Sequence, residues 1–314
     1  NSEEGIINFS NGLLRLEDMT LLPHTPDTLS TIQIACEWTG HEEPTPVFDN
    51  FLHTLTDGDN GTAHLLLQFM GACLSNIKGW RLKKALFLYG KGDTGKSQLK
   101  ALTEKLLGKG NYVGIDLREI EARFGTDNIY GKRLAGSSDM SFLSIDELKT
   151  FKKCTGGDSL FAEFKGQNGF EFIYDGLLWF CMNRLPKFGG DNGQWVYDRM
   201  IQIECKNVIP KEKQDKFLLD KMYAERNGIV YKAIMALKSV ISAGYQFTEP
   251  HSVIEARKIY MEENNTVISF YNDCMTKRPN GKITDQCTTG RIFKVYRAWC
   301  TDNNHGYAQT AKEF

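Results

Sequence analysis

The strongest constraint in this sequence is an apolar run, Ala85 to Tyr89, that leads directly into the pattern GxxxxGKS at Gly90 to Ser97. The glycines of that pattern allow backbone turns that a Cβ atom would hinder, so successive N–H groups can point inward at the phosphates of a nucleotide. The run before the pattern predicts a strand. The residues from near Lys96 onward predict a helix whose positive end faces the same anion. This order predicts an α/β protein with a phosphate-binding loop.

The residue types of the loop predict its chemistry. Lys96 is expected to reach the β and γ oxygens of the nucleotide, and Ser97 is expected to ligate Mg²⁺. A glycine loop without function is the alternative, and the flanking strand and helix patterns argue against it. Nucleotide contacts are expected from Gly90, Lys91, Gly92, Asp93, Thr94, Gly95, Lys96, Ser97 and Gln98.

Composition sets the broad class of the protein. The 314 residues are 41% hydrophobic and 25% charged, which is typical of an ordinary globular protein of two or three domains. The formal net charge is -1, so the chain as a whole is not attracted to nucleic acid or to membranes. Binding to DNA is neither supported nor excluded by this charge, and it would have to come from local patches.

Cysteine usage and hydropathy predict a cytoplasmic protein. The eight cysteines are dispersed, without a CxxC pair or nearby histidines at zinc spacing, which indicates reduced thiols. No apolar run approaches the roughly 18 residues that span a bilayer, and the first residues do not resemble a signal peptide. The missing initiator Met and the end at Phe314, within an amphipathic stretch, suggest a piece of a longer protein.

Four regions are predicted along the chain. Residues 1–80 contain short apolar runs and then two helical patterns, which indicates strands and loops followed by a helical unit. Residues 81–210 alternate helix and strand candidates, as in a sheet covered by helices on both faces. Residues 211–250 are predicted to form a helical connector. Residues 251–314 are predicted to form a small helix-rich module, and a single long helix is expected from Pro250 to Met275.

Three residues outside the loop are expected where a nucleotide hydrolase needs an acid, a polar group that orients water, and a cation. Asp139 ends a strand-like run and is predicted to lie beside the metal, with a surface turn acid as the alternative. Asn183 follows the most apolar strand candidate and is predicted to sense the γ-phosphate, with a turn asparagine as the alternative. Arg199 precedes another strand and is predicted to act as a finger for a neighbouring subunit, with a surface ion pair as the alternative.

A β-hairpin is predicted between Phe161 and Phe172. Apolar and polar residues alternate on both sides of Gly166-Gln-Asn-Gly169, as in two antiparallel strands joined by a turn. Lys165 and Asn168 at its tip are candidates for contact with a DNA backbone, and a merely solvated turn is the alternative.

In this order the segments resemble the superfamily 3 helicases of the phage and plasmid primase-helicase type, which occur in phages, plasmids and mobile genomic islands. The resemblance covers nearly the whole chain, and the ordered set is more specific than any one segment. The similar segments are Asn11 to Leu16 and Leu22 to Asp27 near the start, Gly131 to Leu134 at the beginning of the Walker B region, Lys153-Cys-Thr-Gly-Gly-Asp158 before the sensor strand, Met182 to Pro186 with the sensor asparagine, and Asp198 to Met200 with the arginine finger.

The resemblance implies a P-loop AAA+ core with an N-terminal helical domain and a hexameric ring that binds ATP between subunits. It also implies single-stranded DNA in the channel and 3′-to-5′ unwinding of forked DNA during replication, in the cytoplasm of a bacterial host. The tail from Val267 to Phe314 resembles a winged-helix module. A primase domain before Asn1, or other replication proteins as partners, are left open.

Two departures from the family pattern stand out. Thr94 occupies a position where the family usually has Asn. Asp139 is not followed by the second acid that family members tend to carry. Asp146 or Glu147 could supply that carboxylate, which leaves the water-activating base open.

The segment between Cys274 and Cys300 has a local excess of basic residues. Six Lys or Arg residues stand against one acid, Asp285. Candidate contacts to DNA phosphates are Lys277, Arg278 and Arg291, although a solvated helical face explains the excess equally well.

The sequence therefore predicts an ATP-dependent replicative DNA helicase that works as a hexameric ring. Catalysis is assigned to Lys96, Asp139, Asn183 and Arg199, with Mg²⁺ held by Ser97 and Asp139. Two alternatives stay open. One is a small-molecule phosphotransferase, because the loop alone does not separate a kinase from a motor. The other is an initiator that binds ATP and DNA without unwinding.

Overall fold

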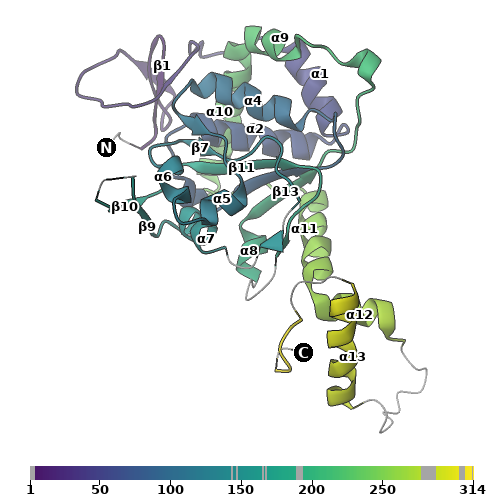
Figure 1. Ribbon diagram of the computed structural model, residues 1–314. Helices are drawn as coiled ribbons and strands as arrows, with labels where there is room; N and C mark the ends of the chain where they lie inside the picture. The colour runs from purple at the N-terminus through teal and green to yellow at the C-terminus, as the bar shows by residue number, and fades with distance from the viewer. Residues whose placement is uncertain are drawn as a thin grey trace.

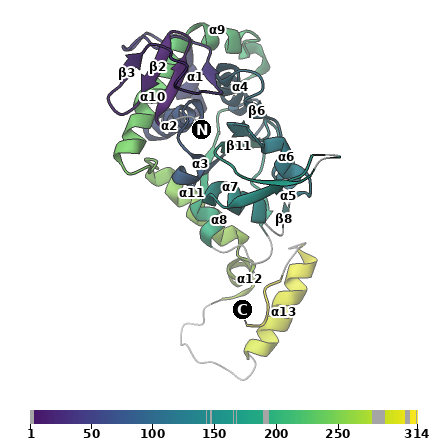
Figure 2. The same ribbon diagram turned by 90° about the vertical axis from the view of Figure 1, so that its left-hand side faces the viewer.

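The computed structural model describes residues 4–142, 144–145, 148–164, 166, 168–188, 194–276, 288–303, 308–312 and 314. It is a mixed α/β structure in which helices surround a central parallel sheet (Figure 1). The last helices extend away from this body, as Figure 2 shows from a second direction. Within the described part of the chain, no helix is long and apolar enough to cross a membrane.

The first forty residues build a small sheet of four strands. Strand β1 (Ile6–Phe9) pairs antiparallel with β2 (Gly12–Arg15), so both strands predicted in this region are confirmed. Strand β3 (Thr20–Leu22) pairs antiparallel with β2, and β4 (Gln33–Ile34) pairs parallel with β1. These two strands are too short to produce a recognisable alternation of apolar and polar residues in the sequence.

Two helices follow, as predicted: α1 (Pro46–Leu55) and α2 (Asn60–Leu74). The side chain of Asp59 caps α2 by accepting hydrogen bonds from the backbone N–H groups of Gly61 and Thr62, at 2.9 and 3.2 Å. Helix α2 packs closely on α10 (Arg226–Ser242), because a Cβ atom on Gly71 would lie 2.1 Å from the carbonyl oxygen of Ala233.

The central sheet has five parallel strands. Successive residues of its strands point to opposite faces, and helices cover both faces, as predicted (Figure 1). All residues of strand β11 are buried. Because every strand is parallel to its neighbours, their carboxyl ends meet at one edge of the sheet. The strand order is β13 (Met200–Glu204), β5 (Ala85–Tyr89), β11 (Leu177–Met182), β7 (Leu134–Ala135) and β6 (Tyr112–Val113).

Short helices and one further strand pair complete the body. Helix α4 (Lys96–Leu107) begins where the sequence predicts, and the helix expected over residues 117–124 is found as α5 (Leu117–Glu121). The helix α6 (Gly125–Ile129) was not expected from the sequence. The other elements are α3 (Gly79–Leu82), α7 (Lys149–Gly156), α8 (Gln194–Asp198), the 3₁₀ turn η1 (Lys211–Lys213), α9 (Leu218–Ala224), and the parallel pair β8 (Ser144–Ile145) and β12 (Lys187–Phe188).

The predicted hairpin is confirmed. Strand β9 (Ser159–Ala162) pairs antiparallel with β10 (Phe170–Ile173), and Phe170 lies opposite Ala162. Together they form a separate two-stranded sheet beside the main one. Asn168 is exposed in the turn, and Lys165 lies outside the described residues.

The single long helix expected from Pro250 to Met275 is wrong. The structure has two helices, α11 (His251–Asn264) and α12 (Thr266–Cys274), with Asn265 in an extended conformation between them. The Asn265 side chain accepts from the backbone N–H groups of Val267 and Ile268, at 3.0 and 3.3 Å. Asparagine favours such local hydrogen bonds over a helix interior, so it ends one helix and caps the next.

Helix α13 (Thr289–Asp302) packs on α12 through a small aromatic core. The Tyr296 ring lies 5.5 Å from the Phe270 ring and 4.8 Å from the Phe314 ring. Residues 277–287, which include Lys277 and Arg278, are outside the described residues, and the winged-helix character of this region stays a prediction.

A fully buried arginine joins the helical unit to the sheet. The guanidinium of Arg133 donates to the carbonyl oxygens of Ala72 (2.5 Å), Cys73 (3.2 Å), Ile77 (2.7 Å) and Asp175 (2.7 Å). Two of these carbonyls lie in the last turn of α2, where the helix itself offers no donors. Burial lowers the pKa of Arg133, yet a guanidinium keeps its proton under all ordinary conditions. Arg133 thereby fixes the end of α2 against the start of β7.

We predict that Arg133→Met lowers the free energy of unfolding by at least about 2 kcal/mol. The carbonyls of Cys73 and Ile77 lose their donor, whereas those of Ala72 and Asp175 keep one from Ser75 and Gly79, and each unpaired buried group costs about 1–3 kcal/mol. Urea unfolding followed by circular dichroism measures the change. Arg123→Met is the control, because the Arg123 side chain is 78% exposed and its loss should stay within about 0.5 kcal/mol. Equal effects of the two substitutions would contradict this role of Arg133.

Candidate nucleotide-binding site

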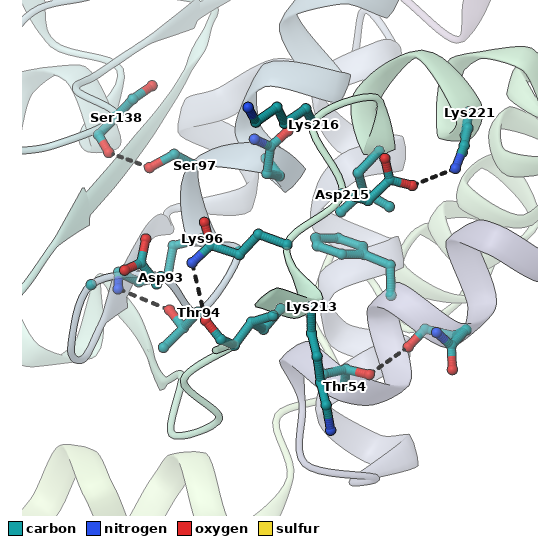
Figure 3. A pocket seen from close by; sticks show the side chains of 18 of the residues that line it. Thr54, Asp93, Thr94, Lys96, Ser97, Ser138, Lys213, Asp215, Lys216 and Lys221 are labelled. Carbon is teal, nitrogen blue, oxygen red and sulfur yellow. Dashed lines mark hydrogen bonds and ion pairs between the residues drawn. The ribbon is translucent and has the colours of Figure 1, made fainter. Parts of the chain in front are cut away.

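A cavity of about 890 Å³ opens at the carboxyl ends of the parallel strands. The predicted loop forms its floor, and the ends of β7 and β11 form one side. Helix α1 and the segment 209–218, which we call the strap because it connects β13 to α9 across the opening, form the rest (Figure 3). Of the loop residues predicted to bind a nucleotide, those that line the cavity are Gly92, Asp93, Thr94, Gly95, Lys96, Ser97 and Gln98.

The loop has the backbone conformation that its glycines predict. Gly90 and Gly95 have φ angles of 132° and 95°, and Asp93 has a φ of 59°. A Cβ atom on Gly90 would lie 2.3 Å from the carbonyl oxygen of Cys205, and one on Gly95 would lie 2.9 Å from the Phe51 ring. The residue that follows β13 and a side chain of helix α1 therefore lie in close contact with the loop. Burial raises the pKa of Cys205 to about 12, so this thiol stays protonated at neutral pH.

Lys96 is folded into its own loop. Its ammonium donates to the carbonyl oxygens of Gly90 (2.9 Å) and Lys91 (2.6 Å) and to the hydroxyl of Thr94 (3.0 Å). The side chain is 6% exposed, at the first turn of α4. Thr94, which replaces the family's usual Asn, supplies an oxygen acceptor to this lysine, so the departure keeps a polar contact at this position.

Ser97, Asp139 and Asn183 meet at the cavity. The Ser97 hydroxyl donates to the carbonyl oxygen of Ser138 at 2.7 Å, which places it beside the residue before Asp139. The chain after β7 runs alongside β11, because Met140 N–H donates to the Cys181 carbonyl at 2.8 Å. Asp139 and Asn183 are both exposed toward the cavity at neighbouring strand ends.

The oxygen donors at this place fit Mg²⁺. A serine hydroxyl and one carboxylate are hard ligands, and Mg²⁺ in nucleotide sites is held by one or two protein groups, waters and phosphate oxygens. The described residues contain no group of three His, Cys, Asp or Glu side chains that would form a complete metal cage. Asp146 and Glu147, the candidates for a second acid, lie outside the described residues.

The strap and the helix α9 that follows it add lysines that were not predicted from the sequence. Lys213, Lys216 and Lys221 line the cavity, and Lys221 is paired with Asp215 at 2.5 Å (Figure 3). Lys213 and Lys216 are exposed, and neither side chain has a hydrogen bond or ion pair among the described residues. The strap is tied to the loop, because Ile209 N–H donates to the Asp93 carbonyl at 2.8 Å. A lysine-rich segment directly after a core strand was the signal that could have found them.

The opposite wall comes from α1, whose place at the cavity no sequence pattern predicts. Asn50, Phe51 and Thr54 line the cavity. The amide of Asn207, just after β13, donates to the Thr54 carbonyl at 2.8 Å and to the Asp57 carboxylate at 3.0 Å. The end of α1 is therefore fixed to the end of β13, and the cavity has a defined width.

Arg199 does not line the cavity. It lies immediately before β13, and its carbonyl oxygen accepts from Ala85 N–H, at the start of β5, at 2.8 Å. These are the amino ends of the strands, and the cavity lies at the carboxyl ends. A strand of five residues separates the two edges by roughly 16 Å. The Arg199 side chain is therefore out of reach of the cavity of its own chain.

The predicted DNA contacts also lie away from the cavity. Asn168 is exposed in the turn of the hairpin, and Arg291 is exposed in the first turn of α13. Neither residue lines the cavity. Lys165, Lys277 and Arg278 lie outside the described residues.

Comparison with protein families gives two matches. Residues 88–199 match a family of unknown function (DUF5906), and residues 1–57 match the family described as D5 N terminal like. The first match contains the loop, Asp139, Asn183 and Arg199. The second contains the N-terminal sheet and α1.

Among curated proteins, the chain is 25% identical over 282 residues to "Putative helicase 022R" of Frog virus 3 (isolate Goorha). The alignment covers 81% of this chain and 28% of the relative, so the chain spans about 28% of that protein's length. The D5 N-terminal match and this helicase confirm the resemblance to phage-type primase-helicases that the sequence motifs indicate.

Solved structures of the NrS-1 C-terminal region are also similar to the chain. The A form apo structure shares 17% identity, with a TM-score of 0.49, and the match covers 76% of this chain and 60% of that one. A further apo structure of the same region gives a TM-score of 0.43, with 82% of this chain and 63% of that one covered.

We predict that Gly90→Ala lowers the free energy of unfolding by about 2 kcal/mol, because the added Cβ atom meets the Cys205 carbonyl and alanine disfavours this φ angle. Thermal and urea unfolding without ligand measure the change. Gly92→Ala is the matched control within the same loop, since no atom lies within 4 Å of its added Cβ. Its stability should stay within about 0.5 kcal/mol of the wild type. A Gly90→Ala variant as stable as the Gly92→Ala variant would contradict the loop conformation.

Proposed function

We infer that this chain binds ATP with Mg²⁺ and hydrolyses it. The observation that carries the proposal is the convergence of Lys96, Ser97, Asp139 and Asn183 on one cavity at the carboxyl ends of a parallel sheet. Ligands bind at this edge in open α/β sheets, and the loop with positive φ glycines leads into the amino end of the twelve-residue helix α4. Such an arrangement suits a triphosphate.

Each side chain has a separate task in this proposal. The Lys96 ammonium would leave the carbonyls of Gly90 and Lys91 and donate to β- and γ-phosphate oxygens instead. Its positive charge would then be paired with the phosphates. Ser97 and Asp139 hold Mg²⁺, which when bound neutralises charge that develops on the phosphates. Asn183 offers an amide to the γ-phosphate and the attacking water.

Arg199 acts on the nucleotide of a neighbouring copy. Its place at the amino ends of β5 and β13 excludes a contact with its own cavity. An arginine supplied by another subunit stabilises the charge of a phosphoryl-transfer transition state. The proposed assembly is therefore a closed ring in which the arginine edge of one protomer faces the cavity edge of the next.

We extend the proposal to a replicative DNA helicase with a P-loop AAA+ core over 81–210, on the basis of the helicase relative and the segment resemblance. Residues 1–80 form its helical lead-in, 211–250 its connector and 251–314 a winged-helix-like module. A hexameric ring, single-stranded DNA in the channel and 3′-to-5′ travel belong to this proposal. The exposed hairpin, with Asn168 at its turn, is the proposed contact to the DNA backbone, and Arg291 is a second one.

Two experiments separate the helicase from its rivals. ATP turnover that rises when single-stranded DNA is added, without a phosphorylated acceptor, separates a DNA motor from a small-molecule phosphotransferase. Displacement of a labelled strand from forked DNA separates a helicase from an initiator that only binds ATP and DNA. Turnover that is insensitive to DNA, with a phosphorylated small molecule as product, would overturn the proposal.

We predict that Lys96→Ala abolishes ATP hydrolysis, with a loss of at least about 100-fold in kcat, because the phosphate oxygens lose their charged donor. A coupled assay of phosphate release measures the loss, and circular dichroism checks the fold. Lys109→Ala is a matched control, since Lys109 is an exposed lysine that does not line the cavity. Unchanged turnover in Lys96→Ala would mean that the loop does not hold the substrate.

We predict that Lys216→Ala weakens ATP binding about three- to tenfold, because an unpaired cation at the cavity is lost. The effect should shrink as salt is raised, since the group is exposed and screened. Calorimetric titration with a non-hydrolysable ATP analogue at two salt concentrations measures both. Lys211→Ala is the control, because Lys211 belongs to the strap but does not line the cavity. Equal affinities of the two variants for the ATP analogue would contradict a role of Lys216 in ATP binding.

A further inference from the structure

Arg199 is held by a defined group of residues that we call the socket: Lys152, Thr155, Gly156, Asp158 and Trp195. The Arg199 Nη1 atom donates to the carbonyl oxygen of Lys152 at 2.9 Å and to the hydroxyl of Thr155 at 2.7 Å. Its guanidinium carbon lies 5.7 Å from the centre of the Trp195 ring. Most of the socket lies near the carboxyl end of α7, where the helix dipole is negative.

Close neighbours explain why residues 156 and 157 of the segment Thr155-Gly156-Gly157-Asp158 are glycines. A Cβ atom on Gly156 would lie 3.2 Å from Arg199 Nη1, so the absence of a side chain admits the guanidinium. Gly157 ends α7 with a φ of 82°, and a Cβ atom there would lie 3.0 Å from the Trp80 ring. Asp158 then faces Arg199 as the favourable charge. Gly156 therefore leaves room for the arginine, and Gly157 leaves room for Trp80.

One side of the guanidinium remains available. Both hydrogen bonds of Arg199 use Nη1, and among the described residues Nε and Nη2 have no hydrogen-bond partner. The residue is half-buried. An arginine that is anchored through one nitrogen loses less conformational freedom when its other donors bind a phosphate, since the side chain is already ordered.

We propose that Thr155 and Gly156 are positioning residues that hold Arg199 so that its free N–H donors face the nucleotide of the adjacent copy. This inference rests on the proposed function of Arg199 as a finger in trans. The socket assigns a role to the segment Lys153 to Asp158, which does not line the cavity. Strand β9 starts at Ser159, directly after Asp158, so the socket and the hairpin share one support.

The experiment compares Thr155→Val with Thr155→Ser in the full chain. Valine keeps the size of threonine and removes the acceptor, whereas serine keeps the hydroxyl. We expect Thr155→Val to lower kcat at saturating ATP at least about tenfold and to leave the affinity for ATP unchanged. Thr155→Ser should retain most of the activity. Arg199→Ala is measured alongside, and the double variant Arg199→Ala with Thr155→Val should be no slower than Arg199→Ala alone.

Mixing of variants tests whether the loss of turnover in Thr155→Val arises from Arg199 acting at a neighbouring protomer's site. Lys96→Ala protomers have an intact Arg199 and socket but an inactive cavity. Added to Thr155→Val protomers, they should restore turnover in part, as they should for Arg199→Ala. A loss in Thr155→Val that mixing does not restore would overturn the proposal, because the defect would then lie in the protomer's own site.

Different results would contradict the role of the socket and the role of Arg199 in the neighbouring site. Wild-type turnover in Thr155→Val together with an inactive Arg199→Ala would overturn the socket and leave the arginine finger intact. Full activity in Arg199→Ala would contradict the action of Arg199 on a neighbouring nucleotide, and with it the positioning role of the socket. If Thr155→Val does not fold, Gly156→Ala replaces it, because its Cβ atom would lie 3.2 Å from Nη1 and crowd the guanidinium. The same tenfold loss and the same restoration are then expected, and wild-type turnover would overturn the socket.

Discussion

The placement of strand β11 between β5 and β7 is the constraint on which the site depends. Parallel pairing sets Met182 opposite Tyr89 on one side, and a backbone bridge sets Met182 opposite Met140 on the other. Asn183 therefore emerges between the phosphate loop and Asp139. A slip of one residue in this register would turn every buried side chain of β11 to the opposite face. Since all residues of β11 are buried, such a slip would disrupt the packing of the core. The packing of the core therefore also holds the residues of the site in place.

The same sheet separates the two halves of the proposed chemistry. The carboxyl ends of its strands carry the cavity, and the amino ends of β5 and β13 carry Arg199. A single protomer cannot bring these groups together, because a rigid strand lies between them. A head-to-tail contact between copies brings one edge against the other, and repetition of a contact of this kind closes a ring or builds a filament. The sheet thus sets the geometry of the cavity, and the proposed chemistry requires an assembly because of it.

The sequence predicted the features that local chemistry decides. The glycines, Lys96 and the flanking apolar run fix the loop and α4, and the buried run of β11 fixes the place of Asn183. Tertiary contacts decide the rest. The strap is a lysine-rich segment after a core strand, but the packing of distant segments decides that its lysines, like Phe51 of α1, reach the cavity. Arg133 lies in a segment that resembles the Walker B region, yet its side chain is buried against carbonyls of α2, which an arginine rarely does.

Helix α7 links the core to Arg199 and to the hairpin. The Glu121 carboxylate accepts from Thr150 and Phe151 N–H, both at 2.8 Å, at its start, and Arg199 binds its last turn. Phe151 packs against Phe87 of the core. A helix fixed at both ends and along one face moves as a rigid body, if it moves at all. The hairpin that follows it must then move with the Arg199 socket rather than independently. A force on the hairpin would therefore reach the arginine at the edge of the sheet.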